Sequence, residues 1–398
     1  MGTADSESSW LSALLAPVSA DEFLSRYWLT QHLFCRGSAD RFAGLLSWTA
    51  LNGMLAHHWR EPHRFRLACQ GRDLDPATYA DIGTSNSRIR AKDVTDQLRR
   101  GATLSFDGID ELHEPLTRLS ESFEAFFRGD TQINLYAAWR GVHGLDLHRD
   151  DQEVFILQLD GRKRWLLYGV SVDGVDRAEL KTTAVPPAGA SFDQVLQTGD
   201  LLYIPRGCYH LAVPMNEPAL HLTVGVKNPR GMDLLRWMVE RLRTNDIANR
   251  DLPYFAGSAE RRRYSEELRH RLLDGLAPDL VEQYFCEVGG NLKPRPSFNL
   301  PWSATLDGLP PGSGFRVQLK ARCHIAVTVG DGGAIELRCG GRRCRFPRSM
   351  QAIVEQLEEG VPRPISDVID AVADRLDEGM VRTLVGMLLQ QDLIAIHE

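Results

Sequence analysis

The fold of this chain is decided by two stretches of sequence, GLDLHRDDQEVFIL at residues 144–157 and QTGDLLYIPRGCYH at residues 197–210. In the first, a polar loop runs into an apolar strand. The side chains of His148 and Asp150, two positions apart in extended backbone, point to the same side. In the second, a Gly-Asp turn leads into a buried strand, and Pro205 and Gly207 turn the chain sharply before His210. This order predicts that His210 lies beside the first pair.

Two imidazoles and one carboxylate on one face could hold a metal ion and leave three of its positions open. Non-haem iron(II) oxygenases use this arrangement, because a bidentate co-substrate and dioxygen must both reach the metal. The His-x-Asp pair alone could equally lie on a solvated strand edge, since a chain with 12 histidines contains about one such pair by chance. The second stretch decides between these interpretations, and we expect His148, Asp150 and His210 to be metal ligands.

The sequence around these stretches, from about Phe65 to Val226, predicts a mainly β domain. Short apolar runs are separated by Gly, Asp and Pro turns, most clearly at residues 133–138, 154–159, 164–168 and 200–204. Many short strands at this spacing are typical of a barrel or a double-sheet jelly roll. Before this domain, residues 1–60 combine helical apolar spacing with a strand-like piece at 33–35, so we expect an N-terminal helical segment.

A group of cations lies between the two stretches, in the sequence DGRKRW at residues 160–165. A charge run of this kind is most often a solvated hairpin. Lys163, thirteen residues after Asp150, could instead point inward and pair with the distal carboxylate of a dicarboxylate co-substrate. We expect the inward arrangement.

After Pro229 the pattern changes to helices. The apolar residues of one predicted helix fall on a single face: Leu234, Leu235, Met238, Val239 and Leu242. A second helix is expected over about 260–273, ended by Gly275. Residues 230–300 could form a lid on the β domain, a layer packed on it or a homodimer surface. We expect the homodimer surface.

The last segment, residues 301–398, predicts a winged-helix-like domain. A strand-rich part at 314–345 precedes helical patterns at 349–358, 365–376 and 380–391, and an apolar end follows at 393–396. From Arg348 to the end there are four Arg and no Lys against ten Asp and Glu. Because nucleic-acid binding needs clustered cations, we do not expect a nucleic-acid partner for this domain.

Composition narrows the class of protein. A chain with 43% hydrophobic and 25% charged residues is typical of a globular protein, and its formal net charge of -7 argues against general polyanion binding. No run of eighteen apolar residues occurs, which argues against a membrane-spanning helix. The seven cysteines lack a disulfide spacing, so a cytoplasmic location is expected. Cys323, His324, Cys339 and Cys344 include no CxxC pair, so we expect buried or half-buried thiols rather than a zinc site.

Taken together, these motifs resemble those of the JmjC-type ribosomal oxygenases, which are histidyl and arginyl protein hydroxylases. The resemblance is carried by the segments Asn134-Leu-Tyr136, Gly144, His148–Asp151, Glu153–Lys163, Gly199–Gly207 and His221-Leu-Thr223. It covers most of residues 21–230 and, more loosely, the parts that follow. It implies a JmjC double-stranded β-helix of the cupin type at residues 61–229, between the N-terminal segment (1–60) and the two C-terminal regions (230–300 and 301–398).

The resemblance also implies roles for individual residues. Iron(II) would be held by the three predicted ligands, and 2-oxoglutarate, the co-substrate, would place its C5 carboxylate on Lys163. Asn134, Tyr136 and Thr223 would line the co-substrate pocket, although Tyr136 could be a plain core residue and Thr223 a plain strand residue. His221 is expected to be a structural histidine with satisfied hydrogen bonds.

The chain departs from this family between Tyr136 and His148. Family members tend to carry Thr-Pro-Pro and Ser there, whereas this chain has Ala138-Trp139-Arg140 and Val142, and Arg149 replaces an aromatic residue. The iron chemistry survives these changes, but the family's target side chain cannot be carried over. We expect a hydroxylase of a protein or peptide side chain. The alternatives are a hydroxylase of a ribosomally made peptide or small molecule, an N-methyl-lysine demethylase and a metal-free cupin binding module.

Overall fold

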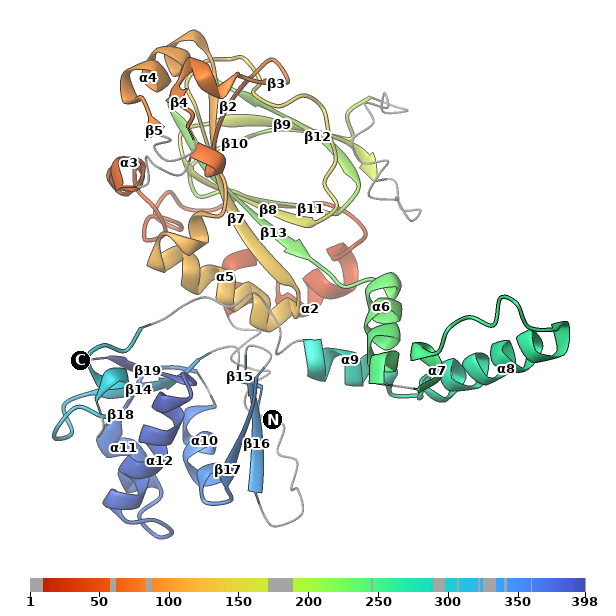
Figure 1. Ribbon diagram of the computed structural model, residues 1–398. Coiled ribbons are helices and arrows are strands. Elements are labelled where there is room, and N and C mark those ends of the chain that lie inside the picture. Colours follow the sequence, from red (N-terminus) through yellow and green to blue (C-terminus); the bar gives the residue numbers. More distant parts are fainter. Residues whose placement is uncertain are drawn as a thin grey trace. The chain divides into compact units, whose positions relative to one another are not determined.

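The computed structural model describes residues 10–57, 62–83, 88–170, 189–244, 246–288, 298–305, 308–320, 323–324, 334–339, 342–358 and 360–397. The chain separates into two compact units, residues 1–228 and 229–398. Figure 1 labels the helices and strands of both units. None of the described helices combines the length and the apolar character needed to cross a membrane.

The first unit is built on two antiparallel sheets (Figure 1). The larger sheet has the strand order β1-β11-β8-β13-β7-β6-β2-β3, and the smaller has the order β10-β9-β12. The strands of the larger sheet are β1 (Leu33–Cys35), β2 (Phe65–Cys69), β3 (Arg72–Asp73), β6 (Thr103–Phe106), β7 (Asp130–Ala138), β8 (Glu153–Asp160), β11 (Leu201–Ile204) and β13 (Ala219–Lys227). Those of the smaller sheet are β9 (Lys163–Val170), β10 (Phe192–Leu196) and β12 (Cys208–Pro214), and β4 (Ala80–Asp81) pairs separately with β5 (Arg88–Ile89).

Alternate side chains of the larger sheet belong to two different cores. On β8, Phe155 and Leu157 join the core formed with the helices of this unit, whereas Val154 and Ile156 join a second core. This second core also contains Trp165 and Leu167 of the smaller sheet. It therefore fills the space between the two sheets, as the period of two along a strand requires.

Helices cover the outer face of the larger sheet. They are the helical residues 10–15, α2 (Ala20–Glu22) with the π-helical turn Phe23–Tyr27, α3 (Trp48–His57), α4 (Ala91–Arg100) and α5 (Glu114–Phe127). Leu11, Leu15 and Phe23 are buried in the same core as the outer face of β8. The N-terminal helical residues are therefore part of the first unit's main core.

Two of these helices, α4 and α5, lie within the stretch for which only strands were expected. In α5 the buried Leu116, Ser120 and Phe123 recur at the helical spacing. Pro115 lies in the first turn of α5, where proline costs no hydrogen bond. It therefore begins a helix and does not mark a turn between strands. In α4 the helix ends at Gly101, whose φ of 109° is the left-handed conformation typical of a helix end.

The second unit begins with helices and continues with short sheets around a core of its own. Its helices are α6 (Gly231–Arg241), α7 (Asp246–Asn249), α8 (Ser258–Asp274), α9 (Leu280–Val288), α10 (Met350–Leu357), α11 (Ile365–Ala371) and α12 (Glu378–Gln390). Its strands are β14 (Arg316–Leu319), β15 (Cys323–His324), β16 (Ala334–Cys339), β17 (Arg342–Pro347), β18 (Arg363–Pro364) and β19 (Ile394–His397). The helix α11 is shorter than predicted, because the backbone leaves the helical conformation at Val372.

The cysteine group of the second unit is described only in part. The side chains of Cys323, His324 and Cys339 lie outside the described residues. Cys344 is a buried free thiol whose Sγ lies 3.7 Å from Oε1 of Gln391.

Candidate metal centre

His148, Asp150 and His210 come together between the two sheets of the first unit. One ligand atom of each lies within 4.8 Å of the others, and the described residues contain no second group of three such side chains. Nε2 of His210 lies 3.6 Å from Oδ2 of Asp150, and Nε2 of His148 lies 4.0 Å from Oδ1. The three residues that the sequence predicts as ligands therefore share one site.

Backbone hydrogen bonds hold this arrangement. His148 and His210 form an isolated antiparallel bridge, in which the N–H of His210 donates to the carbonyl of His148 (2.8 Å) and the reverse bond measures 3.2 Å. The N–H of Gly207 donates to the carbonyl of Asp150 at 3.0 Å. Gly207 has a φ of 79°, which glycine adopts without strain. The Pro-x-Gly turn of the sequence therefore ties the segment before His210 to the His-x-Asp segment.

Both histidines present Nε2 to the site. Nδ1 of His148 lies 2.8 Å from the carbonyl oxygen of Asp146, and Nδ1 of His210 lies 3.0 Å from that of Cys208. A carbonyl oxygen only accepts hydrogen bonds, so each Nδ1 carries a proton, and Nε2 is the nitrogen left to face the site. This is the way in which proteins orient histidine ligands toward a metal.

Burial keeps His210 neutral. The residue is only 4% exposed, and this desolvation, together with the neighbouring His148, lowers its pKa to about 4, although Asp150 acts in the opposite direction. At neutral pH the ring therefore carries no proton on Nε2. A neutral imidazole is the form that binds a metal ion.

A cavity of about 70 Å³ adjoins these three residues. A single water needs about 10–15 Å³ by this measure, so the cavity has room for a small molecule rather than one solvent molecule. The lining residues are Thr103, Tyr136, Gly144, Leu145, His148, Asp150, Val154, Ile156, Lys163, Trp165, His210, Ala212, His221 and Thr223.

Lys163 points into this space from β9. It is 4% exposed, and no acidic side chain among the described residues forms an ion pair with it. Its neighbours Arg162 and Arg164 are instead exposed and paired with Glu217 and Asp193. Burial without a counter-charge lowers the pKa of Lys163 to about 7. An anion in the cavity would supply the missing counter-charge.

Three further polar atoms in the cavity wall are buried without a hydrogen-bond partner among the described residues. They are Oγ1 of Thr103, Nε1 of Trp165 and Nδ1 of His221. Buried polar groups in native proteins are almost always paired, so such atoms need an explanation such as an absent ligand or water. Together with Lys163 they point to a polar ligand with acceptor atoms.

The sequence reasoning missed Thr103 and Trp165, and it expected His221 to be a satisfied structural histidine. Trp165 could have been found, because it lies two residues after Lys163 on the same strand face. His221 stacks on Tyr136, with ring centroids 5.1 Å apart and planes 10° apart. Burial and the nearby Lys163 lower its pKa well below the usual value, so it is neutral. No sequence signal marks Thr103.

Two of the three predicted pocket residues line the cavity, and the third does not. Tyr136 and Thr223 line the cavity. Burial, Asp107 and Asp150 raise the pKa of Tyr136 to about 12, so its hydroxyl remains protonated. Asn134 is not among the lining residues. Its Oδ1 accepts hydrogen bonds from the N–H of Gly108 (3.0 Å) and from Nε2 of Gln132 (3.2 Å).

The segment that contains His148, Asp150 and His210 is similar to a known protein domain. Residues 111–234 match the family model described as the JmjC domain. Similar proteins include ribosomal oxygenase 2 of Rattus norvegicus, which is 27% identical over 374 residues, covering 82% of this chain and 74% of that protein. The bifunctional lysine-specific demethylase and histidyl-hydroxylase NO66 of Drosophila grimshawi is 30% identical over 225 residues, covering 54% of this chain and 30% of that protein.

The fold is also found among solved structures. The structure of Escherichia coli YcfD aligns with a TM-score of 0.58 and 17% identity, covering 96% of this chain and 98% of that one. A second structure of YcfD, described as a ribosomal oxygenase in complex with cobalt and 2-oxoglutarate, aligns with a TM-score of 0.56. At this identity the likeness supports the fold alone, and it extends over both units of the chain.

Proposed function

We propose that the chain is an iron(II)- and 2-oxoglutarate-dependent oxygenase that hydroxylates a side chain of a protein or peptide. The match of residues 111–234 to the JmjC domain and the similarity to ribosomal oxygenase 2 support this proposal. One observation carries the proposal. Two imidazole Nε2 atoms and one carboxylate converge beside a cavity that contains a buried lysine without an acidic partner among the described residues. This combination fits a redox metal and a dicarboxylic co-substrate together.

In this proposal His148, Asp150 and His210 hold iron(II). When bound, the metal with 2-oxoglutarate and dioxygen supplies an oxidation in which 2-oxoglutarate becomes succinate and carbon dioxide and one oxygen atom enters a substrate C–H bond. The protein orients the reactants and keeps the site dry. Asp146 and Cys208 contribute their carbonyl oxygens, which hold the two rings in position.

The co-substrate is placed by the unpaired groups of the cavity. The ammonium of Lys163 pairs with the C5 carboxylate, since a charge-assisted hydrogen bond is the strongest available there. Thr103 and Trp165 offer donors for its remaining oxygen atoms, and Tyr136 and Thr223 complete the polar wall. Asn134 acts indirectly, by holding the turn at Gly108.

The experiment that tests this function is mass analysis of candidate proteins and peptides after incubation with iron(II), 2-oxoglutarate and dioxygen. A gain of one oxygen atom with matching succinate is expected. Formaldehyde release would support a lysine demethylase instead, an activity that appears in the name of the Drosophila relative. If no succinate formed, either with any candidate substrate or without a substrate, the proposal of an enzyme would be contradicted and a metal-free binding module favoured.

Binding of 2-oxoglutarate is expected to weaken above neutral pH. The ammonium of Lys163 is present below its pKa of about 7, so the dissociation constant should be flat between pH 6 and 7. Above pH 7 the lysine is neutral and must take up a proton on binding. The dissociation constant should therefore rise by up to about tenfold per pH unit. Calorimetry on the anaerobic Mn(II)-loaded protein at pH 8, in two buffers with different ionisation enthalpies, should show nearly one proton taken up. No proton uptake would contradict the inward ammonium.

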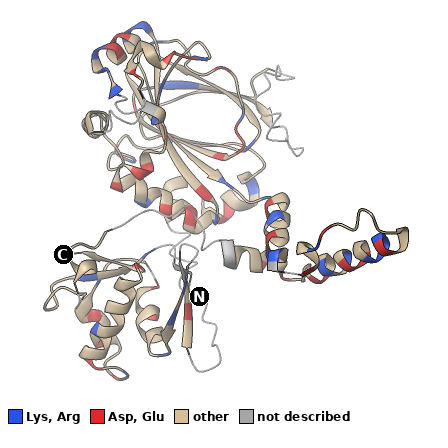
Figure 2. Cartoon of the chain, viewed as in Figure 1, with Lys and Arg blue, Asp and Glu red and all other residues tan. Residues whose placement is uncertain are grey.

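We also propose that the protein is a homodimer assembled through residues 231–275. On α6, Met232, Leu235 and Val239 are 57%, 46% and 56% exposed, and at this spacing they form one apolar face. Phe255, before α8, is 97% exposed. Charged residues of both signs run along α8 (Figure 2), so the apolar surface comes from α6 and from the loop before α8. Such a surface usually marks a contact with another chain.

Light scattering should therefore give twice the mass of 44.6 kDa. The double variant Leu235→Asp/Val239→Asp should be monomeric, because two carboxylates cannot be desolvated in an apolar interface. The matched variant Glu240→Asp, at an exposed position of the same helix, should stay dimeric. A wild-type mass of one chain would contradict the dimer.

The division of the chain into four regions and the winged-helix-like end are likewise proposals. The order of α10, α11, α12 and β19 after the strands β14 to β17 supports the winged-helix interpretation of residues 301–398.

A further inference from the structure

The first unit contains a second, much larger hollow, separate from the metal centre. It is a groove of about 1020 Å³ on the helix-covered side of the larger sheet, and we call it the α3–α4 groove. Leu51 and Leu55 of α3 form one wall, and Val94 and Leu98 of α4 form the other. Strand β6 separates it from the metal centre. Thr103 lines the cavity, Leu104 lines the groove, and no described residue lines both.

Trp139 and Arg140 line the groove. Trp139 packs against Trp48 of α3 with ring centroids 5.6 Å apart, and Nε1 of Trp48 donates to Oδ2 of Asp160 at 2.6 Å. Nε of Arg140 donates to the carbonyl of Arg99 at 3.2 Å. Both side chains are therefore held in place by contacts within this unit.

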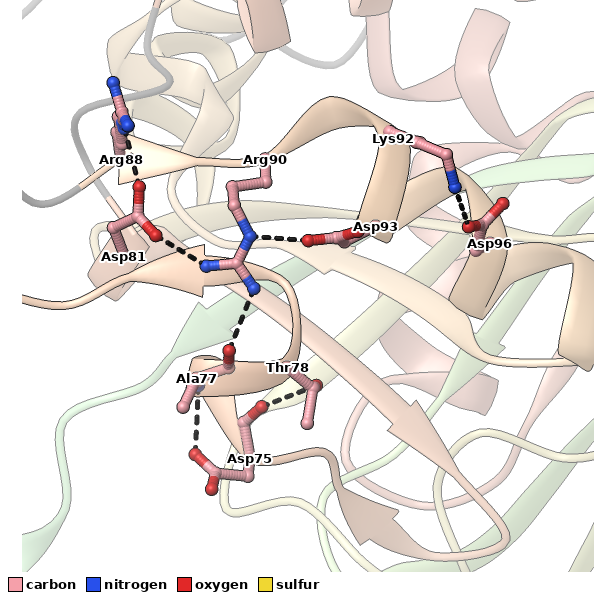
Figure 3. Close-up of polar contacts among 9 residues, drawn as sticks. All are labelled: Asp75, Ala77, Thr78, Asp81, Arg88, Arg90, Lys92, Asp93 and Asp96. Atoms are coloured by element: carbon pink, nitrogen blue, oxygen red, sulfur yellow. Dashed lines mark hydrogen bonds and ion pairs between the residues drawn. The ribbon is translucent and has the colours of Figure 1, made fainter.

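Four arginines line the groove, Arg88, Arg90, Arg99 and Arg140, and its described lining residues include no acidic residue. Figure 3 shows that two of these arginines are already paired: Arg90 lies between Asp81 and Asp93, and Arg88 contacts Asp81. Arg99 pairs with Asp96 at 3.2 Å. Within the described part of the chain, Arg140 alone among the four has no acidic partner, so its guanidinium is available to an anionic ligand.

We propose that the α3–α4 groove binds an amphipathic helix of a partner protein, with acidic residues beside its apolar face. Small-molecule pockets span about 300–1000 Å³, so this volume is at the upper limit for a small ligand. Two helices form the walls, which suits a third helix laid between them with apolar residues at i, i+4 and i+7. The carboxylates of that helix would meet Arg140. The inference stands without the proposed oxygenase function, because the groove and the cavity have separate walls.

A peptide-display selection on the full-length protein tests this inference. The library consists of 14-residue helices with apolar residues at i, i+4 and i+7 and with Glu, Lys, Gln or Ser at equal frequency elsewhere. Soluble Thr95→Trp protein is the competitor, because Thr95 is an exposed groove residue and the indole fills the groove without removing a core side chain. We expect surviving peptides to be enriched in Glu over Lys and to bind Thr95→Trp at least about tenfold more weakly.

Charge reversal gives the second arm. Arg140→Glu should weaken the selected peptides by at least about tenfold. Arg118→Glu, on the exposed surface of α5 and away from the groove, should not. Unfolding midpoints of the three variants should match the wild type, which separates lost binding from lost folding. The inference is overturned if no peptide survives the competitor, if the survivors are Lys-rich or indifferent to Arg140→Glu, or if oleate binds the groove and the peptides do not.

Discussion

Replacing Asp150 by alanine should abolish iron binding and succinate formation while leaving the protein folded. The two histidines that remain cannot hold the metal alone, and the loss should exceed the about 10–100-fold in metal affinity that removing an outer-shell partner costs. The Asp150 side chain is 39% exposed and belongs to no apolar core, so the free energy of unfolding should change by no more than about 0.5 kcal/mol. Anaerobic metal titration, succinate assay and thermal unfolding measure the three quantities. His148→Ala should behave in the same way.

The control is Asp146→Ala. The Asp146 carboxylate is exposed and pairs only with His143 in the described part of the chain, while its backbone carbonyl, which orients His148, is retained in the variant. Metal binding should therefore stay within a few fold of wild type. If Asp150→Ala kept a full equivalent of iron and the wild-type succinate rate, the assignment of the metal centre would be wrong.

Replacing Lys163 by methionine should raise the 2-oxoglutarate requirement by roughly 10²- to 10³-fold. Leaving a buried charge without its partner costs about 3–5 kcal/mol, and in this variant the unpaired charge is the C5 carboxylate of the bound co-substrate. Iron binding should persist, because the three proposed ligands lie outside β9. Titration of 2-oxoglutarate against succinate formation measures the co-substrate requirement, and anaerobic metal titration measures iron binding.

Arg162→Met is the matched control. Its guanidinium makes two hydrogen bonds to Glu217, at 2.8 and 2.9 Å, on the exposed side of the hairpin. Surface pairs contribute only about 0–1 kcal/mol, so the 2-oxoglutarate requirement of this variant should be that of wild type. Equal behaviour of Lys163→Met and wild type, or impairment of Arg162→Met alone, would contradict the placement of the co-substrate.

The same lysine variant should affect stability in the opposite direction. In the unfolded chain the pKa of Lys163 is near 10.5, and in the folded protein burial lowers it to about 7. Below pH 7 the buried ammonium therefore destabilises the ligand-free folded state. This destabilisation disappears as the pH rises from about 7 to 10.5. At pH 6 the free energy of unfolding of Lys163→Met should exceed that of wild type by an amount on the order of a few kcal/mol. Thermal unfolding should show this as a higher midpoint temperature. The gain should shrink toward pH 9.

The sequence by itself determined that His148, Asp150 and His210 would lie together. His148 and Asp150 are two positions apart, the spacing at which side chains of an extended segment share one side. Gly207 adopts a positive φ, which suits glycine, and the turn that it forms with Pro205 determines that β12 begins at Cys208, two residues before His210. Lys163 was also predictable from the strand that it begins. These features depend on neighbours within a few residues, which is the range over which a sequence pattern is informative.

Only the tertiary structure decided what surrounds these residues. Thr103, Trp165 and His221 come from three strands far apart in the sequence, and their unpaired atoms face one cavity because the two sheets close on each other. The period of two shows that a side chain faces the sheet interior, but not which strand lies opposite. The α3–α4 groove has the same origin, since α3 and α4 are separated by more than thirty residues and meet only where both pack on the larger sheet. Contacts between distant segments follow from how apolar faces are buried together, and that is a property of the whole fold.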